Sequence, residues 1–212
     1  MEYGLYVITD EKPSKGLTHV EIARRAIAGG ADVIQLRDKT SDCPYLLESA
    51  FEINALAKEA GVRFIVNDRL DIALQSGADG VHIGQGDMPL KFARGLAPKN
   101  FIVGVSAGTL QEALEAERDG ADYIGVGPVF ATTSKDDAGK ACGLETLKAI
   151  RSRISIPVVA IGGIGAHNAA DVIAAGADGI AVISAVVSQD DVTAATRKLK
   201  AIVTAARSRV RA

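Results

Sequence analysis

The chain has 212 residues, a formal net charge of −2 at pH 7 and 48% apolar residues, with no tryptophan. This length fits one domain whose core is built from Val, Ile, Leu and Ala. The small net charge argues against a nucleic-acid-binding protein, which needs a basic surface to displace counterions. Cys43 and Cys142 lie far apart and match no zinc-binding or redox spacing. There is no signal-peptide pattern and no apolar run that could span a bilayer, so we expect a soluble cytoplasmic protein without a membrane partner.

The first predicted elements are a strand at Gly4 to Thr9 and a helix at Thr18 to Ala28. A glycine-containing phrase at 29–37 then ends this helix and begins a second strand. Similar phrases, each with a Gly-Ala-Asp sequence before an apolar run, recur at 76–84, 119–127 and 175–184. Glycine adopts the left-handed conformation at a helix end at little cost, so each phrase predicts a helix-to-strand junction.

Further apolar runs between these phrases predict strands at Val62 to Val66, Phe101 to Val105 and Pro157 to Ile161. Helical patterns separate the strands, at Pro44 to Ala60, Leu70 to Gln75, Leu90 to Ala97, Leu110 to Arg118, Leu144 to Arg151, Asn168 to Ala175 and Val192 to Arg209. Candidate N-terminal caps are Asp42, Thr109 and either His167 or Asn168. Eight strand–helix units predict an α/β fold, a single-domain (β/α)8 TIM barrel over residues 1–212, with its active site at the C-terminal ends of the strands. An open doubly wound sheet is the alternative.

Polar residues follow the second predicted strand. Gln35, Arg37 and Lys39 occupy alternate positions, which point the same way in an extended segment. Two cations and an amide suit a phosphate or a pyrophosphate. The alternative interpretation is a pair of solvated charges in a loop.

Two carboxylates follow the third and fourth predicted strands. Taken singly, Asp68 and Asp87 are better explained as caps of the helices that begin near Leu70 and Pro89. Neighbouring strands lie ~4.8 Å apart, however, so both carboxylates can approach one ion. Beside pyrophosphate-binding cations they would repel the ligand unless a divalent metal bridged them, and Mg²⁺ favours few carboxylates with water and substrate phosphates. The combination predicts Mg²⁺ at Asp68 and Asp87, with Asn67 donating to a phosphate oxygen.

The C-terminal half offers a second candidate phosphate site. Gly127 to Lys135 contains three hydroxyl side chains and one cation, which indicates either a mobile surface loop or a lid that closes Lys135 onto a ligand. Gly162 to Gly165 precede a helix, and Ser184 follows the eighth strand. Barrels often bind phosphate between the loops after strands seven and eight, where glycine lets backbone N–H groups approach. Tight turns are the alternative.

No residue pattern in the sequence indicates a nucleophile. There is no nucleophile elbow and no cysteine near a histidine, and His19, His82 and His167 have no metal-ligand spacing. We expect His82, inside a strand, to be packed and hydrogen-bonded. Two phosphate sites and one metal suit a reaction in which pyrophosphate departs with metal assistance and a second, phosphorylated substrate captures the resulting cation. Such a reaction relies on positioning and electrostatic stabilisation.

In this order, eight segments resemble those of the thiamine phosphate synthase family over nearly the whole chain. They are LYVITD (5–10), VIQLRDK (33–39), VNDRLDIA (66–73), GADGVHIGQGD (77–87), GVSAG (104–108), GADYIGVGPVF with TSK (120–135), VVAIGGI (158–164) and GADGIAVISA (176–185). The resemblance implies a cytoplasmic, Mg²⁺-dependent transferase that joins a hydroxymethylpyrimidine pyrophosphate to a thiazole phosphate. It implies small phosphorylated substrates as partners and leaves homo-oligomer formation open.

The resemblance also implies a role for each matching residue. The pyrimidine pyrophosphate would be held by Gln35, Arg37, Lys39, Asn67, Ser106 and Lys135. The thiazole phosphate would be held by Thr132, Ser134, Gly163, Ile183 and Ser184. Mg²⁺ would bind Asp68 and Asp87, and the catalytic residues would be Lys135, Ser106 and Arg37. Where the family usually has threonine, proline and an acidic residue, this chain has Ser134, Ala131 and Gly86.

Two other functions compete with this one. A sister family with the same barrel isomerises an aminothiazole carboxylate phosphate and has a histidine where this chain has Pro128. That family also tends to lose pyrophosphate and metal residues that this chain keeps. A non-catalytic ligand-binding or regulatory barrel is the third possibility, although it would not need the whole set of cations and carboxylates.

Overall fold

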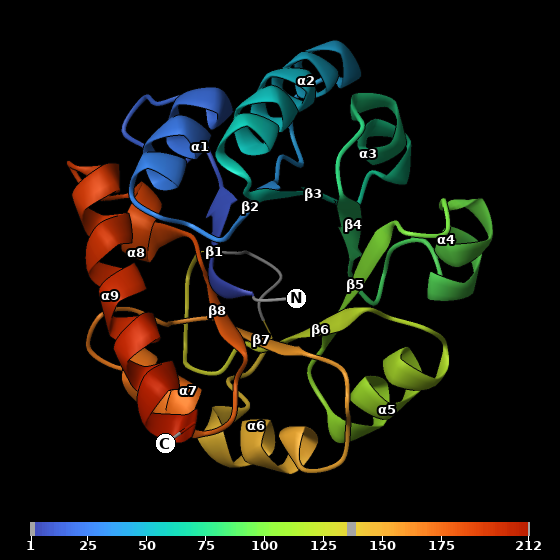
Figure 1. Cartoon of the computed structure of the whole chain (residues 1–212). Coiled ribbons are helices and arrows are strands. Elements are labelled where there is room, and N and C mark those ends of the chain that lie inside the picture. The colour runs from blue at the N-terminus through green and yellow to red at the C-terminus, as the bar shows by residue number, and fades with distance from the viewer. Residues whose placement is uncertain (1–2, 135–138, 212) are drawn as a thin grey trace.

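The computed structural model describes residues 3–134 and 139–211, which form a closed parallel β-barrel surrounded by helices (Figure 1). The strands are β1 (Gly4–Thr9), β2 (Val33–Leu36), β3 (Arg63–Asn67), β4 (Gly80–Ile83), β5 (Ile102–Ala107), β6 (Tyr123–Val126), β7 (Val158–Ile161) and β8 (Gly179–Val182). They pair in chain order, and β8 closes the barrel against β1. The predicted (β/α)8 fold is confirmed, and the open-sheet alternative is wrong.

The helices lie outside the strands and cover them (Figure 1). They are α1 (His19–Ala28), α2 (Cys43–Ala60), α3 (Leu70–Ser76), α4 (Leu90–Leu96), α5 (Leu110–Arg118), α6 (Gly143–Arg151), α7 (Ala169–Ala174), α8 (Ser184–Val187) and α9 (Val192–Arg211). The short α8 was not predicted, because four residues carry no helical periodicity. Asp42 and Thr109 cap α2 and α5 with their side chains, as predicted. Asn168 occupies the cap position of α7 but makes no capping hydrogen bond with its side chain.

Alternation along each strand divides the core into two layers. In β1, Tyr6 and Ile8 pack inside the barrel, whereas Leu5 and Val7 pack between the strands and the helices. This is the period of two that a strand buried on both faces requires. None of the helices in the described part of the chain is long and apolar enough to cross a membrane.

The repeated Gly-Ala-Asp phrases have a common structural role. Each aspartate directly precedes an even-numbered strand, and its side chain accepts a hydrogen bond from a backbone N–H near the start of the preceding odd-numbered strand. The aspartates are Asp32, Asp79, Asp122 and Asp178, and the donors are the amides of Leu5, Phe64, Val103 and Val158, at 2.7, 2.9, 2.7 and 2.9 Å. These bonds satisfy buried backbone donors at the amino-terminal end of the barrel.

Asp178→Ala is expected to lower the free energy of unfolding by roughly 1–3 kcal/mol, because it leaves the buried Val158 N–H without its acceptor. Urea denaturation measures this loss, and KM should not change because Asp178 lies at the end of the barrel opposite the strands' carboxyl ends. Asp190→Ala is the control, since Asp190 forms only an exposed pair with Lys15. Equal losses in the two variants would contradict the proposed role of the phrase.

Candidate active site at the carboxyl end of the barrel

A cavity of about 650 Å³ opens at the carboxyl ends of the strands. The last residue of β3 and the segments after β2, β3 and β4 contribute Arg37, Lys39, Asn67, Asp68 and Asp87 to its wall. The segments after β6, β7 and β8 contribute Thr132, Ser134, Gly163, Ile183 and Ser184. Because the barrel is closed in chain order, the two sets come from opposite halves of the ring. One cavity thus brings both predicted ligand sites together.

One described residue of the predicted site, Gln35, is not on this wall. Gln35 is 2% exposed and does not line the cavity; its side chain is buried in the barrel, where its Nε2 donates to Tyr6 Oη at 2.7 Å. Lys135, the predicted lid cation, lies outside the described residues. Ser106, in contrast, lies one residue before the end of β5 and lines the cavity together with His82.

The capping interpretation of the two carboxylates is wrong. The N-cap residues of α3 and α4 are Arg69 and Pro89, and neither helix has a side-chain capping bond. Asp68 instead has a left-handed backbone (φ 61°), which is uncommon for residues other than glycine and is frequent at functional sites. Its Oδ2 lies 3.7 Å from Lys39 Nζ. Asp87 Oδ2 accepts a 2.7 Å hydrogen bond from Gly84 N, which holds the carboxylate against its own turn.

The oxygen donors in the cavity fit Mg²⁺. Among the described residues, no group of three or more His, Cys, Asp and Glu side chains could hold a metal ion unaided. Mg²⁺ does not need such a group, because it usually keeps several waters and takes one or two carboxylates together with substrate phosphates. Asp68 and Asp87 supply two such carboxylates on the same cavity wall. The donor set therefore suits an ion that is completed by a phosphorylated ligand.

Arg37 is fixed by a carboxylate that the sequence did not suggest. Its Nη1 lies 2.7 Å from Asp10 Oδ2, and the two side chains are only 11% and 9% exposed. Its Nε is buried and has no hydrogen-bond partner among the described residues. Because buried donors are normally satisfied, this N–H is a candidate contact for an anionic ligand.

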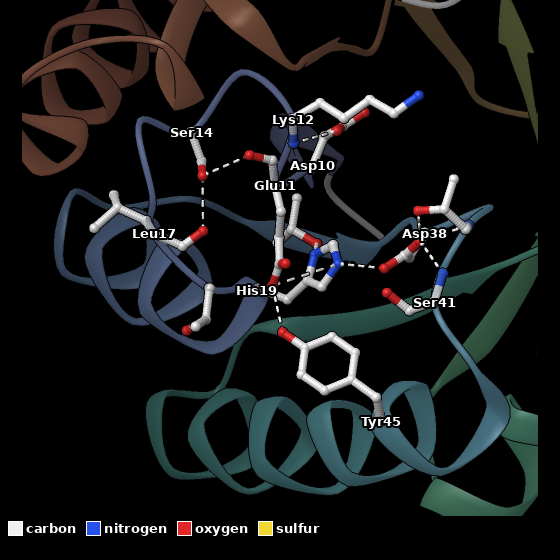
Figure 2. A network of polar contacts seen from close by, with 12 residues as sticks. Asp10, Glu11, Lys12, Ser14, Leu17, His19, Asp38, Ser41 and Tyr45 are labelled. Carbon is white, nitrogen blue, oxygen red and sulfur yellow. Dashed lines mark hydrogen bonds and ion pairs between the residues drawn. The ribbon is translucent and has the colours of Figure 1, made fainter.

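A network of polar side chains supports the segment that carries Arg37 and Lys39, and Figure 2 shows His19 at its centre. His19 is 1% exposed, and its ring nitrogens contact Thr9 Oγ1 at 2.8 Å and Asp38 Oδ2 at 3.1 Å. Asp38 Oδ1 accepts from the backbone N–H groups of Thr40 and Ser41 at 2.7 and 3.0 Å. The hydrogen bond from His19 thus connects Asp38, which lies between Arg37 and Lys39, to α1.

These contacts make one pH effect predictable. Burial opposes the charge of Asp38, but its hydrogen bonds to Ser41, Thr40 and His19 outweigh burial and hold its pKa well below the ordinary value. A lowered pKa in the folded state adds stability above the unfolded-state pKa of about 3.9, and this stability is lost as the pH falls towards the folded-state pKa. The stability difference between the wild type and Asp38→Asn should therefore be constant near neutral pH and shrink below about pH 4. Denaturation at a series of pH values tests this, and a difference that grows in acid would contradict it.

The opposite half of the cavity is lined by hydroxyls and glycines. Ser134 Oγ lies 2.9 Å from Ser184 Oγ, which joins the loop after β6 to the start of α8. Gly163 has φ 64°, and a Cβ there would lie 2.7 Å from Ala131 O, so this position requires glycine. Asn168 supports the same turn, because its Oδ1 accepts from Gly165 N at 2.8 Å and its Nδ2 donates to Gly163 O at 3.0 Å.

Sequence reasoning missed several residues of this site. Gln85 lines the cavity, and its Nε2 donates to the Ser106 carbonyl at 2.6 Å. Glu112 also lines it, and its Oε2 accepts from Gly108 N at 2.6 Å. Both hold the backbone next to Ser106. The position of Gln85 in the segment after a predicted strand could have indicated a site residue. Glu112 lies inside a helix, and its position in the sequence gave no such indication.

The fold and the cavity define a (β/α)8 barrel protein whose carboxyl-end site is equipped for phosphorylated ligands. Residues 5–186 match the family model of thiamine monophosphate synthase. The chain is 72% identical over 203 residues to a thiamine-phosphate synthase of Methanocella arvoryzae, with 96% of each chain covered. It is 56% identical over 208 residues to a thiamine-phosphate synthase of Methanoculleus marisnigri, with 98% of this chain and 99% of the relative covered. The chain belongs to the thiamine monophosphate synthase family, a family of transferases in thiamine biosynthesis.

The solved structures agree with this assignment. A thiamine phosphate pyrophosphorylase from Pyrococcus furiosus has a similar fold, with a TM-score of 0.90 and 46% sequence identity. The alignment covers 96% of both chains. The similarity in sequence and in fold therefore extends over nearly the whole barrel and its cavity.

Proposed function

We propose that this chain condenses 4-amino-2-methyl-5-hydroxymethylpyrimidine pyrophosphate with thiazole phosphate, giving thiamine phosphate and pyrophosphate. The observation that carries the proposal is the single cavity of about 650 Å³ that has cations and carboxylates on one half and hydroxyls and glycines on the other. A condensation of two phosphorylated substrates needs such a pair of adjacent sites. The family membership of the chain supports the same reaction.

In this reaction the C–O bond between the pyrimidine methylene carbon and pyrophosphate breaks, and its electron pair leaves with pyrophosphate. The thiazole ring nitrogen then gives its electron pair to that carbon and forms the new C–N bond. No proton must be removed from the attacking nitrogen. The reaction therefore requires no general base at this nitrogen, and it depends on positioning and charge stabilisation.

Arg37, Lys39 and Asn67 hold the pyrophosphate of the first substrate. Arg37 presents a planar guanidinium kept in place by Asp10, and its buried Nε has no hydrogen-bond partner among the described residues. Ser106 contacts the pyrimidine from near the end of β5. Gln35, the other predicted pyrimidine contact, is buried in the barrel and does not line the cavity, so it is assigned no direct contact. Lys135 joins them from the loop after β6 as a further cation. The catalytic residues are thus Arg37, Ser106 and Lys135.

Asp68 and Asp87 hold Mg²⁺ together with the pyrophosphate oxygens. When bound, the ion supplies positive charge that offsets the charge of the departing pyrophosphate. The two carboxylates stand beside the cations and are not used as helix caps, which supports this role. Lys39 pairs with Asp68 at 3.7 Å, so this cation and the metal site are adjacent.

Thr132, Ser134, Gly163, Ile183 and Ser184 hold the thiazole phosphate. Ser134 and Ser184 already share a hydrogen bond, so their hydroxyls point to a common region. Gly163 allows the backbone to come close to a phosphate, since no Cβ fits there. Asn168 stabilises this turn through its side-chain hydrogen bonds to Gly165 N and Gly163 O.

The test supplies the purified protein with both substrates and Mg²⁺ and follows thiamine phosphate and pyrophosphate. Formation of both products at equal rates is expected, with loss of turnover when EDTA removes the metal. Folded protein that forms neither product would overturn the proposal. A parallel assay for isomerisation of the aminothiazole carboxylate phosphate identifies the sister activity, and tight substrate binding without turnover would indicate a binding protein.

A further inference from the structure

A continuous chain of hydrogen bonds crosses the barrel interior and ends at the cavity. Gln35 Nε2 donates to Tyr6 Oη at 2.7 Å, and Tyr6 Oη lies 3.0 Å from Tyr123 Oη. Tyr123 Oη lies 2.9 Å from His82 Nδ1, and His82 Nε2 lies 3.0 Å from Ser106 Oγ. The five residues come from β2, β1, β6, β4 and β5. Ser106, at one end of the chain, lines the cavity and is the proposed pyrimidine contact, whereas Gln35, at the other end, is buried in the barrel.

Glycines in two strands make room for the rings of this chain. A Cβ at Gly104 would lie 2.1 Å from Tyr123 Cζ. A Cβ at Gly125 would lie 3.0 Å from His82 Cε1. Glycine weakens a strand and often marks a close approach of another group. These two glycines therefore leave room inside the barrel for the rings of Tyr123 and His82.

One arrangement of the hydrogen bonds gives every hydroxyl proton in this chain an acceptor. Since Gln35 donates to Tyr6, the Tyr6 hydroxyl has its own proton available for Tyr123. If Tyr6 donates to Tyr123, the buried Tyr123 proton still needs an acceptor, and His82 Nδ1 at 2.9 Å is within reach. Burial raises the pKa values of both tyrosines, so both keep their protons. A neutral histidine that accepts at Nδ1 carries its proton at Nε2 and donates it to Ser106.

We propose that Tyr123 and His82 are positioning residues that fix the hydrogen-bonding role of Ser106 at the cavity end of the chain. Ser106 Oγ accepts from His82 and so presents its O–H as a donor to the cavity. Gln35, at the other end, uses its amide N–H within the barrel and does not line the cavity. A ring nitrogen of an aminopyrimidine is the acceptor that complements the Ser106 O–H. This assignment of substrate contacts rests on the proposed function, whereas the proton order itself does not.

The proton order can be tested in the ligand-free protein by nitrogen NMR of ¹⁵N-labelled histidine. The His82 signals are assigned by their absence in His82→Gln. We expect a neutral ring with its proton on Nε2 and an accepting Nδ1. A ring protonated on Nδ1, or on both nitrogens, near neutral pH would overturn the proposal. Tyr123→Phe should shift the Nδ1 signal, because the donor is lost.

Tyr3→Phe is the matched control. Tyr3 stacks on Tyr123 with ring centroids 4.6 Å apart, but its hydroxyl makes no hydrogen bond to any described residue. It should leave the His82 spectrum unchanged. Tyr6→Phe is a second test variant in case Tyr123→Phe fails to fold. It removes the hydroxyl that links Gln35 to Tyr123 and leaves the contact between Tyr123 and His82 in place.

Kinetics separate the positioning role from a purely structural one. Tyr123→Phe should lower kcat/KM for the pyrimidine pyrophosphate by about tenfold or more, because misplaced contacts weaken alignment. KM for thiazole phosphate should stay within about twofold, since that site is in the other half of the cavity. Equal effects on both substrates would overturn the substrate assignment. If the wild type forms no product yet His82 has the expected tautomer, the proposed function fails and the proton order stands.

Discussion

Asp87→Asn is expected to lower kcat/KM at least about 100-fold at a fixed Mg²⁺ concentration, the size of effect that loss of one charge-stabilising group produces. Asparagine keeps an oxygen that can accept from Gly84 N, so the turn at 84–87 should survive. It removes the negative charge that a hard cation needs. The melting temperature should therefore change by less than about 3 °C. Steady-state kinetics and a thermal melt measure the two effects.

Calorimetry provides a readout for Asp87→Asn that does not depend on turnover. Mg²⁺ binding in the presence of inorganic pyrophosphate should be weakened in this variant. Asp71→Asn is the matched control, because Asp71 pairs with Arg69 on α3 and does not line the cavity. It should retain wild-type activity and metal binding. A large fall in melting temperature with full activity in Asp87→Asn would show that the residue is structural.

The barrel could be predicted from the sequence because the Gly-Ala-Asp phrase recurs at four helix-to-strand junctions. Each Gly-Ala-Asp phrase marks a helix end and a strand start, and its aspartate has a structural reason to recur at Asp32, Asp79, Asp122 and Asp178. Strand limits shifted by one or two residues, as for β5, which runs to Ala107 and not Val105. Such limits depend on the pairing between neighbouring strands, which one segment does not reveal.

The candidate site was less completely predictable, for reasons that two residues illustrate. Alternation placed Gln35 on the same side as Arg37 and Lys39, but β2 ends at Leu36 and the regular alternation ends with it. Gln35 is therefore inside the barrel while the cations line the cavity. Asp10 was not predicted as a partner of Arg37, because the two residues are 27 positions apart and meet only when β1 and β2 pair.

The pairing of Asp10 with Arg37 leads to the second large expected effect. Asp10→Ala should lower the free energy of unfolding by roughly 3 kcal/mol, because it leaves a largely buried guanidinium without its counter-charge. Asp71→Ala breaks an otherwise similar pair with Arg69, but those side chains are 53% and 40% exposed. It should lower stability by less than about 1 kcal/mol. Urea denaturation of the two variants gives this comparison directly.

Inorganic pyrophosphate with Mg²⁺ distinguishes a structural pair from one that serves the ligand site. If Arg37 binds pyrophosphate, the anion should replace the missing charge in Asp10→Ala. The ligand should then raise the melting temperature of Asp10→Ala by more than it raises that of the wild type, since ligand binding to the folded state adds stability by mass action. An equal or smaller rise would mean that Arg37 does not contact the anion. In that case Arg37 would have only a structural role, and Lys39 and Asn67 would be left as the described residues that hold pyrophosphate.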